Sequence, residues 1–233
     1  MRISLISIFK PVALSIAAIA VIGLGQGVVR ADEVTYAGYT NGTFNGTPAA
    51  MQGPGLQQTS LLGLAYTNAT ISDTTVNGFD GIGGNPSPQG TQGINNLGSF
   101  TLANTENNYN GNTFTLRVTF TLPTGISNPA GASATFSATL TGAVTSLGNG
   151  GVLLDFNNAP ILFTFSNPQA SGSFLLSVND LSIDAGQTAS VTGQITAAQQ
   201  NAIPEPASML LLGTGLAGLA GAVRRKARAR SLK

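Results

Sequence analysis

The side chains that could take part in chemistry are mostly carboxylates. The 233 residues include no histidine and no cysteine, which excludes imidazole acid–base catalysis, Ser-His-Asp hydrolysis, thiol nucleophiles and zinc–thiolate sites. Asp180 and Asp184 lie close together in the sequence, and two carboxylates at a suitable separation can hydrolyse a glycoside. Glycosidases normally hold sugar rings with aromatic side chains, however, and this chain has no tryptophan and only 4 tyrosines. We therefore expect no catalysis.

Calcium binding is the second chemistry that carboxylates could support. Asp80 lies in a glycine-rich stretch near Asn77 and Asn85, and carboxylate, amide and backbone oxygens are the usual ligands of Ca²⁺. The foremost candidates are Asp80, Asp180 and Asp184, with Asp73 and Asp155 as further ones. None lies in an Asp-x-Asp-x-Asp loop, which favours solvated loop carboxylates. We expect no metal site and no cofactor.

The distribution of charge limits the partners of the chain. Between Asp32 and Ala202 there is one basic residue, Arg117, against eight carboxylates, which gives this segment a formal net charge of −7. Nucleic acid binding needs several lysines or arginines to displace counterions from phosphates. We therefore expect no nucleic acid partner.

Three features follow one another after a polar linker at 197–203. Pro204-Glu205-Pro206 places a glutamate between two prolines, which favour an extended and exposed peptide. Residues 207–223 carry no charge, and as a helix they would span about 26 Å, enough to cross a thin bilayer. Arg224-Arg225-Lys226 then open a basic end at 224–233, which should stay in the cytoplasm.

Small residues recur on one face of this predicted transmembrane helix. Gly213, Ala217 and Gly221 occupy every fourth position. A face without bulky side chains permits close packing against a second transmembrane helix, such as one of a processing enzyme. The same composition also suits a weakly hydrophobic anchor that is easily released, and the sequence leaves both interpretations open.

The order of these features resembles the PEP-CTERM sorting signal of Gram-negative bacteria. The resemblance is carried by Pro204-Glu205-Pro206, the apolar run 209–223 and Arg224-Arg225-Lys226, within the segment 204–233. It implies recognition by an exosortase, a multi-pass membrane cysteine protease. It also implies an inner-membrane anchor before processing, followed by transfer to the cell surface or to an extracellular matrix of exopolysaccharide. A plain single-pass anchor is the alternative.

The first 31 residues have the order of a secretory signal peptide. Arg2 and Lys10 precede or border an apolar run at 11–24, and Val29 and Ala31 occupy the positions that signal peptidase reads. We expect export through the Sec translocon and cleavage after Ala31. An uncleaved membrane anchor is the alternative, although the apolar run is short for a full span.

The segment 32–196 has the pattern of an all-β ectodomain. Apolar and polar residues alternate in short runs bounded by glycine, asparagine and proline, most clearly at 113–122, where Arg117 lies on the polar face. We expect strands at 34–39, 61–66, 69–76, 97–102, 113–122, 134–140, 152–156, 161–165, 174–178 and 189–195. The stretch 78–96 should be a long surface loop.

This number of strands without a helical period predicts a two-sheet antiparallel β-sandwich, of jelly-roll or immunoglobulin-like type. A signal helix should precede it and a single transmembrane helix should follow it. We expect a structural or interaction protein of the cell surface or extracellular matrix. A carbohydrate-binding or adhesin-like module, with or without calcium, is the alternative, favoured by the asparagine-rich loops and the acidic surface.

Overall fold

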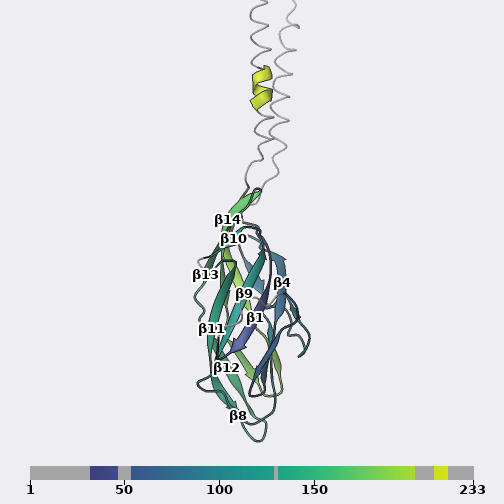
Figure 1. Ribbon diagram of the computed structural model, residues 1–233, viewed down its shortest axis with the longest axis vertical. Coiled ribbons are helices and arrows are strands. Elements are labelled where there is room, and N and C mark those ends of the chain that lie inside the picture. Colours follow the sequence, from purple (N-terminus) through teal and green to yellow (C-terminus); the bar gives the residue numbers. More distant parts are fainter. Residues whose placement is uncertain (1–31, 47–53, 129–130, 203–212, 220–233) are drawn as a thin grey trace, which may run out of the picture. The chain divides into compact units, whose positions relative to one another are not determined.

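The structure is a computed structural model that describes residues 32–46, 54–128, 131–202 and 213–219. The predicted signal peptide at 1–31 lies outside the described residues, and so does most of the predicted tail at 204–233. The described part of 32–202 consists of strands joined by turns and loops (Figure 1).

Backbone hydrogen bonds divide these strands into three sheets. The large sheet has the order β15 (Leu181–Asp184), β12 (Gly150–Phe156), β11 (Ser133–Val144), β9 (Thr113–Leu122), β1 (Thr35–Phe44), β4 (Ala69–Thr74) and β6 (Gly93–Ile94), and β8 (Asn107–Asn108) pairs with β11. The five-stranded sheet has the order β10 (Ile126–Ser127), β13 (Ile161–Ser166), β14 (Ala170–Val178), β17 (Gly193–Ala202) and β5 (Asp80–Ile82). The four-stranded sheet has the order β16 (Thr188–Ser190), β7 (Ser99–Leu102), β3 (Leu64–Thr67) and β2 (Gln58–Leu61).

Strand β9 lies between β1 and β11 in the large sheet (Figure 1). Its side chains alternate as the sequence predicts: Phe114 and Phe120 are buried, and Arg117 is half-buried on the other face. Successive side chains of a strand point to opposite faces, so one face of β9 enters the core and the other faces outward. The predicted strand at 113–122 is confirmed with these bounds.

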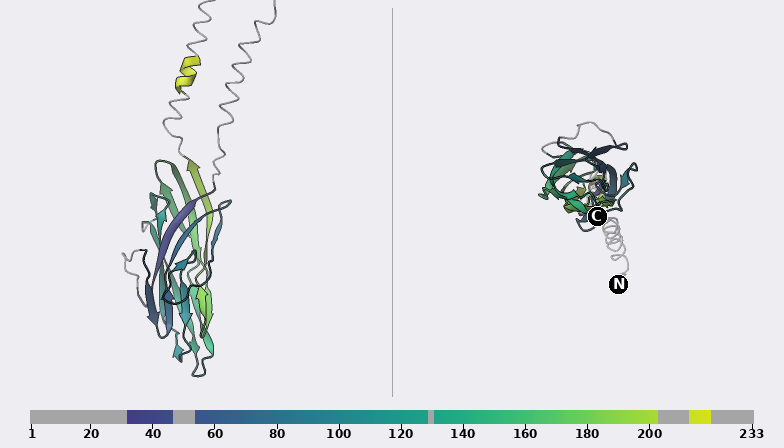
Figure 2. Two further views of the ribbon diagram at one scale, coloured as in Figure 1. Left: turned by 90° about the vertical axis from the view of Figure 1, so that its right-hand side faces the viewer. Right: turned by 90° about the horizontal axis from the view of Figure 1, so that it is seen from below.

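Aromatic side chains join the large sheet to both smaller sheets. Phe114 packs against Phe100 of the four-stranded sheet, with ring centroids 4.8 Å apart. Phe120 packs against Phe163 and Phe174 of the five-stranded sheet, at 4.9 and 5.1 Å. Edge-to-face contacts at these distances are favourable beyond the area they bury. The three sheets therefore curl around one hydrophobic core, as the end-on view in Figure 2 shows.

The predicted fold class is correct at the level of an all-β, antiparallel domain. Among the described strands, every pairing is antiparallel except the one between β4 and β6. The described strands form three hydrogen-bonded sheets where two were predicted, because β2, β3, β7 and β16 pair among themselves and not with the other strands. Alternation shows which face of a strand is buried, but it does not show which strand is its neighbour.

Two segments that lacked an alternating pattern contain strand residues. The stretch 78–96, expected to be a surface loop, contains β5 and β6, which pair with β17 and β4. The polar stretch 197–203, expected to be a linker, belongs to β17 as far as Ala202. These strands are held by backbone hydrogen bonds, which polar residues and glycines form as well as apolar ones do.

The predicted transmembrane helix at 207–223 lies largely outside the described residues, of which 213–219 are helical. Within the part of the chain that the structure describes, no helix has both the length and the apolar character needed to cross a membrane.

Replacing Phe114 with alanine should strongly destabilise the domain. Its side chain is fully buried and contacts the rings of Phe44, Tyr66, Phe100 and Phe156. Loss of a buried phenylalanine leaves a cavity, so the free energy of unfolding should fall by about 3–5 kcal/mol, measured by chemical denaturation.

The matched control for this substitution is Leu147→Ala, because Leu147 is 84% exposed. It should change the free energy of unfolding by less than about 0.5 kcal/mol. Equal effects of the two substitutions would contradict the position of Phe114 at the junction of the sheets.

Candidate functional site

Strand β17 leads directly into the Pro-Glu-Pro sequence. It pairs with β14 as far as Ala202, which lies opposite Ala170. Pro204 follows two residues later, and Glu205 is three residues beyond the strand. Three extended residues span at most about 10 Å, so the connection between the sheet and the Pro-Glu-Pro sequence is short.

A β-bulge divides β17 into two parts. The register with β14 shifts between Ser173 and Leu175, and Ala197 has a φ of 50°. The inner part pairs with β5 at Gly193–Ile195 as well as with β14, and its Ile195 is fully buried. The outer part, Gln199–Ala202, pairs with β14 and with no other described strand.

The described chain enters and leaves this domain at the same end. The backbone N–H of Gly78 donates to the carbonyl of Asp32 at 3.0 Å, and the N–H of Ala198 donates to the carbonyl of Gly78 at 3.1 Å. The turn at Asn77-Gly78 thus contacts both the first described residue and β17. Figure 2, left, shows β1 and β17 reaching the same end of the domain.

A tyrosine and an aspartate join the large and five-stranded sheets near this end. The hydroxyl of Tyr36 on β1 donates to the carboxylate of Asp80 on β5. Tyr36 is almost fully buried. Burial raises the pKa of Tyr36 far above its ordinary value of 10.0, and the hydrogen bond to Asp80 and the charges of Asp80 and Asp73 raise this pKa further.

This contact was not predicted from the sequence, in which Asp80 is only a calcium candidate. Tyr36 and Asp80 lie 44 residues apart, and no local pattern connects them. The structure gives Asp80 a role as the acceptor for a buried hydroxyl. Such an acceptor satisfies a donor that burial would otherwise leave unpaired.

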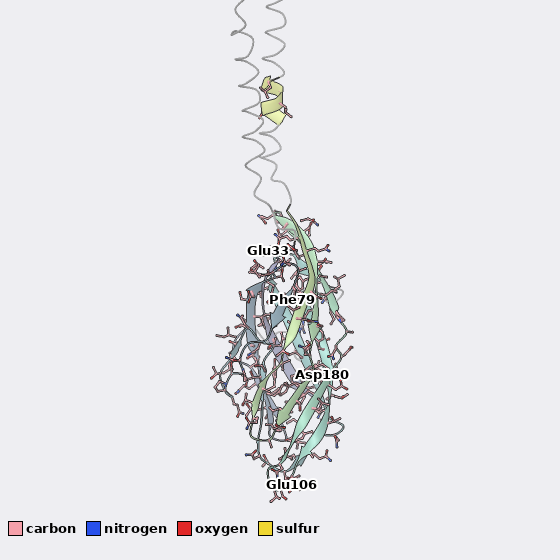
Figure 3. All side chains as sticks on the ribbon, turned by 180° about the vertical axis from the view of Figure 1, so that it is seen from behind. Glu33, Phe79, Glu106 and Asp180 are labelled. Atoms are coloured by element: carbon pink, nitrogen blue, oxygen red, sulfur yellow. The ribbon has the colours of Figure 1, made fainter. Side chains whose placement is uncertain are left out.

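The other calcium candidates are dispersed. The carboxylate of Asp180 accepts a hydrogen bond from the N–H of Phe156 at 2.9 Å, and Asp184 lies on the edge strand β15 opposite Gly151. Figure 3 shows Asp180 between Glu33 and Glu106, which lie near opposite ends of the domain. Among the described residues, no three histidine, cysteine, aspartate or glutamate side chains are grouped so that they could hold a metal ion.

Several predicted site residues lie outside the part of the chain that the structure describes. These are Val29, Ala31, Pro204, Glu205, Pro206, Gly221, Arg224, Arg225 and Lys226. Gly213 and Ala217 are described, and both are exposed in the helical segment 213–219. Their spacing of four residues places them on one face of a helix.

Alkaline pH should destabilise the domain through its buried tyrosines. Burial raises the pKa of Tyr36, Tyr66 and Tyr109 above 10.0. The contribution of these tyrosines to the free energy of unfolding is complete below pH 10. It is lost as the pH rises above 10, because the unfolded chain then releases protons that the folded chain keeps. The free energy of unfolding, measured by denaturation between pH 8 and 11.5, should fall only in the upper part of this range.

Tyr66→Phe provides the matched variant for this pH dependence. Tyr66 is almost fully buried, and its hydroxyl donates to the carbonyl of Leu97 at 2.9 Å. The variant should be less stable below pH 10, and above pH 10 its pH dependence should be shallower by up to about 1.4 kcal/mol per pH unit. An unchanged slope would show that Tyr66 does not remain protonated in the folded state.

Comparison with known proteins identifies the segment that follows β17. Residues 202–226 match the family model of the PEP-CTERM protein-sorting motif. No curated protein and no solved structure matches the chain. The matched segment begins at the last residue of β17 and includes Pro204-Glu205-Pro206 and Arg224-Arg225-Lys226. This chain therefore carries a PEP-CTERM protein-sorting motif, which implies that it is exported and processed by an exosortase.

Proposed function

We propose that the chain is a non-catalytic structural or interaction protein of the cell surface or extracellular matrix. The observation that carries this proposal is the junction at Ala202, where β17 ends and the sorting motif begins. The core contains Ile195 and Ala198 of β17. Cleavage in the sorting motif beyond Ala202 would therefore release the β-domain with all of its described strands.

The arrangement of the polar residues supports a role without catalysis. The calcium candidate Asp80 and the calcium and acid–base candidate Asp180 each accept a hydrogen bond from another described residue. Asp80 lies on β5, whereas Asp180 lies between β14 and β15. Phenylalanine and tyrosine side chains point mainly into the core. A hydrolase would instead need paired acids beside an open, aromatic-lined cleft.

The flanking segments complete this proposal. Residues 1–31 would be removed by signal peptidase after passage through the Sec translocon. Residues 207–223 would hold the precursor in the inner membrane, with Gly213, Ala217 and Gly221 packing against the exosortase. We also propose that the curled sheets belong to a jelly-roll or immunoglobulin-like sandwich, and that exopolysaccharide surrounds the mature protein.

Substitution of both motif prolines, Pro204→Ala with Pro206→Ala, should block processing, because the peptide around Glu205 would lose its fixed extended backbone. The unprocessed precursor should accumulate in the membrane fraction, measured by fractionation and by the mass of the recovered protein. Deletion of 204–233 should abolish surface retention.

The control for the proline substitutions is Pro88→Ala. Pro88 is exposed and lies outside the motif, so this variant should be processed as the unaltered chain is. Normal processing of the double variant, or normal surface retention without 204–233, would contradict the proposed route.

A second candidate function is binding of a neutral carbohydrate. The outward residues of β9 and β11 form a hydroxyl face, which consists of Thr113, Thr115, Thr135, Ser137, Thr139 and Thr141. Register pairs Thr139 with Thr113 and Ser137 with Thr115. Rows of hydroxyls therefore repeat about every 6.7 Å along each strand and about every 4.8 Å between strands.

The hydroxyls of this face are free to bind a ligand. None of the six makes a side-chain hydrogen bond within the described part of the chain, whereas the hydroxyls of Thr35 and Thr74 pair at 2.8 Å and those of Thr101 and Thr188 pair at 3.0 Å. Each threonine presents a hydroxyl beside a methyl group, as a sugar ring presents hydroxyls beside C–H groups. The formal charge of −7 between Asp32 and Ala202 repels polyanionic ligands, which favours a neutral polysaccharide as the ligand.

Removal of these hydroxyls tests the second candidate. Thr113, Thr115, Thr135 and Thr139 would each be replaced by valine, which keeps the branched shape that strands favour. If the face binds glycan, retardation of the full-length chain, purified in mild detergent, in gels containing a neutral β-glucan should fall about tenfold.

The matched control changes two strand threonines outside the hydroxyl face, Thr59→Val and Thr164→Val. It should be retarded as the unaltered chain is, and alginate gels should retard neither variant. Retardation that survives the four substitutions, or that is lost equally in the control, would remove carbohydrate binding by this face.

A further inference from the structure

The sorting motif begins on a strand residue that is still paired. Ala202 lies opposite Ala170 of β14, and the match to the sorting motif starts at Ala202. A protease binds its substrate as an extended peptide whose backbone groups are available to it. With β17 fully paired, the tether from Ala202 to Glu205 spans at most about 10 Å. The edge of the folded domain must then stay within this distance of the membrane protease.

The outer part of β17 is held much more weakly than the inner part. Gln199 and Asn201 are exposed, and the side chains of Gln199–Asn201 make no hydrogen bond to another described residue. Opposite them, β14 contributes Ser171, Gly172 and Ser173. The segment thus adds almost no apolar side chain to the core, and segments of this kind open at low free-energy cost.

The bulge marks the position at which opening should stop. Ala198, beside the bulge, is 2% exposed, and its N–H donates to the carbonyl of Gly78. Further inward, Ile195 is fully buried and β17 is paired on both sides. Opening beyond Ala198 would expose the core, whereas opening up to it would not.

We propose that Gln199–Ala202 separates from β14 when the exosortase takes up the motif, with the bulge at Ala197-Ala198 as the hinge. The inference rests on the proposed processing route. Separation lengthens the free tether to the seven residues from Gln199 to Glu205, which span at most about 24 Å. The outer part of β17 is then a positioning segment that serves as strand in the mature domain and as spacer during cleavage.

A disulfide across the outer pair tests this proposal in the intact precursor. The substitutions Ser171→Cys and Asn201→Cys fall on directly opposed residues, whose Cα separation in an antiparallel pair suits a disulfide. The chain has no other cysteine, so this bond would be unique. In exporting cells, the oxidised variant should be processed at least about tenfold more slowly than the unaltered chain, and a reductant should restore the rate.

Two matched variants separate restraint of the outer part from other effects. The disulfide between Ser177→Cys and Gln194→Cys joins the same two strands in the inner part and should leave processing unchanged. Insertion of a four-residue Gly-Ser spacer after Ala202 should restore processing of the locked variant, because it supplies the missing reach. Measurement of precursor and mature masses over time follows all of these variants.

The outcomes distinguish this inference from the proposed function. If the unaltered chain is not processed, the proposed route fails. If the unaltered chain is processed and the locked variant is cleaved at the same rate, strand separation is not required and the inference is wrong. The inference is also wrong if the inner disulfide slows processing equally, or if the spacer does not rescue the locked variant.

Discussion

The packing of β9 against both smaller sheets is the interaction on which the rest of the structure depends. Phe114 and Phe120 lie on the same face of one strand, yet they contact different sheets, at Phe100 and at Phe163 and Phe174. The chain has no cysteine, so no disulfide can hold the sheets together. Burial of aromatic and aliphatic side chains must therefore supply the stability of the domain.

This dependence on burial explains how one strand can serve two purposes. Ile195 and Ala198 anchor β17 in the core, while Gln199–Ala202 contributes backbone pairing and the side chains of Gln199–Asn201 are polar. Changes in the outer part can therefore alter the path of the chain toward the sorting motif without a large effect on the fold. Tyr36 and Asp80 also stabilise this end of the domain. Their hydrogen bond joins the large and five-stranded sheets next to the point where the chain leaves the domain.

The sequence was sufficient to predict those features whose pattern lies within a few adjacent residues. Alternation at 113–122 predicts β9 with its observed bounds, and the order of prolines, apolar residues and arginines predicts the sorting motif that the family comparison finds at 202–226. Both signals are contained in a few adjacent residues. The burial pattern of β9 needs only a period of two, and the sorting motif needs only its residue types in a fixed order.

The sequence was insufficient to predict those elements whose structure depends on a partner distant in the sequence. β5 is a strand because Asp80–Ile82 meets β17, more than a hundred residues away, and its glycine and aspartate carry no strand signal of their own. The hairpin of β2 and β3 turns at Leu62-Gly63, where both residues have positive φ, although 61–66 reads as one strand. The end of β17 also depends on a distant partner. The sequence of Gln199–Ala202 predicts a linker, and only its pairing with β14 makes it a strand. A segment whose structure comes only from a neighbouring backbone can lose that structure without disturbing a core, and this property is what a junction between a stable domain and a processed tail requires.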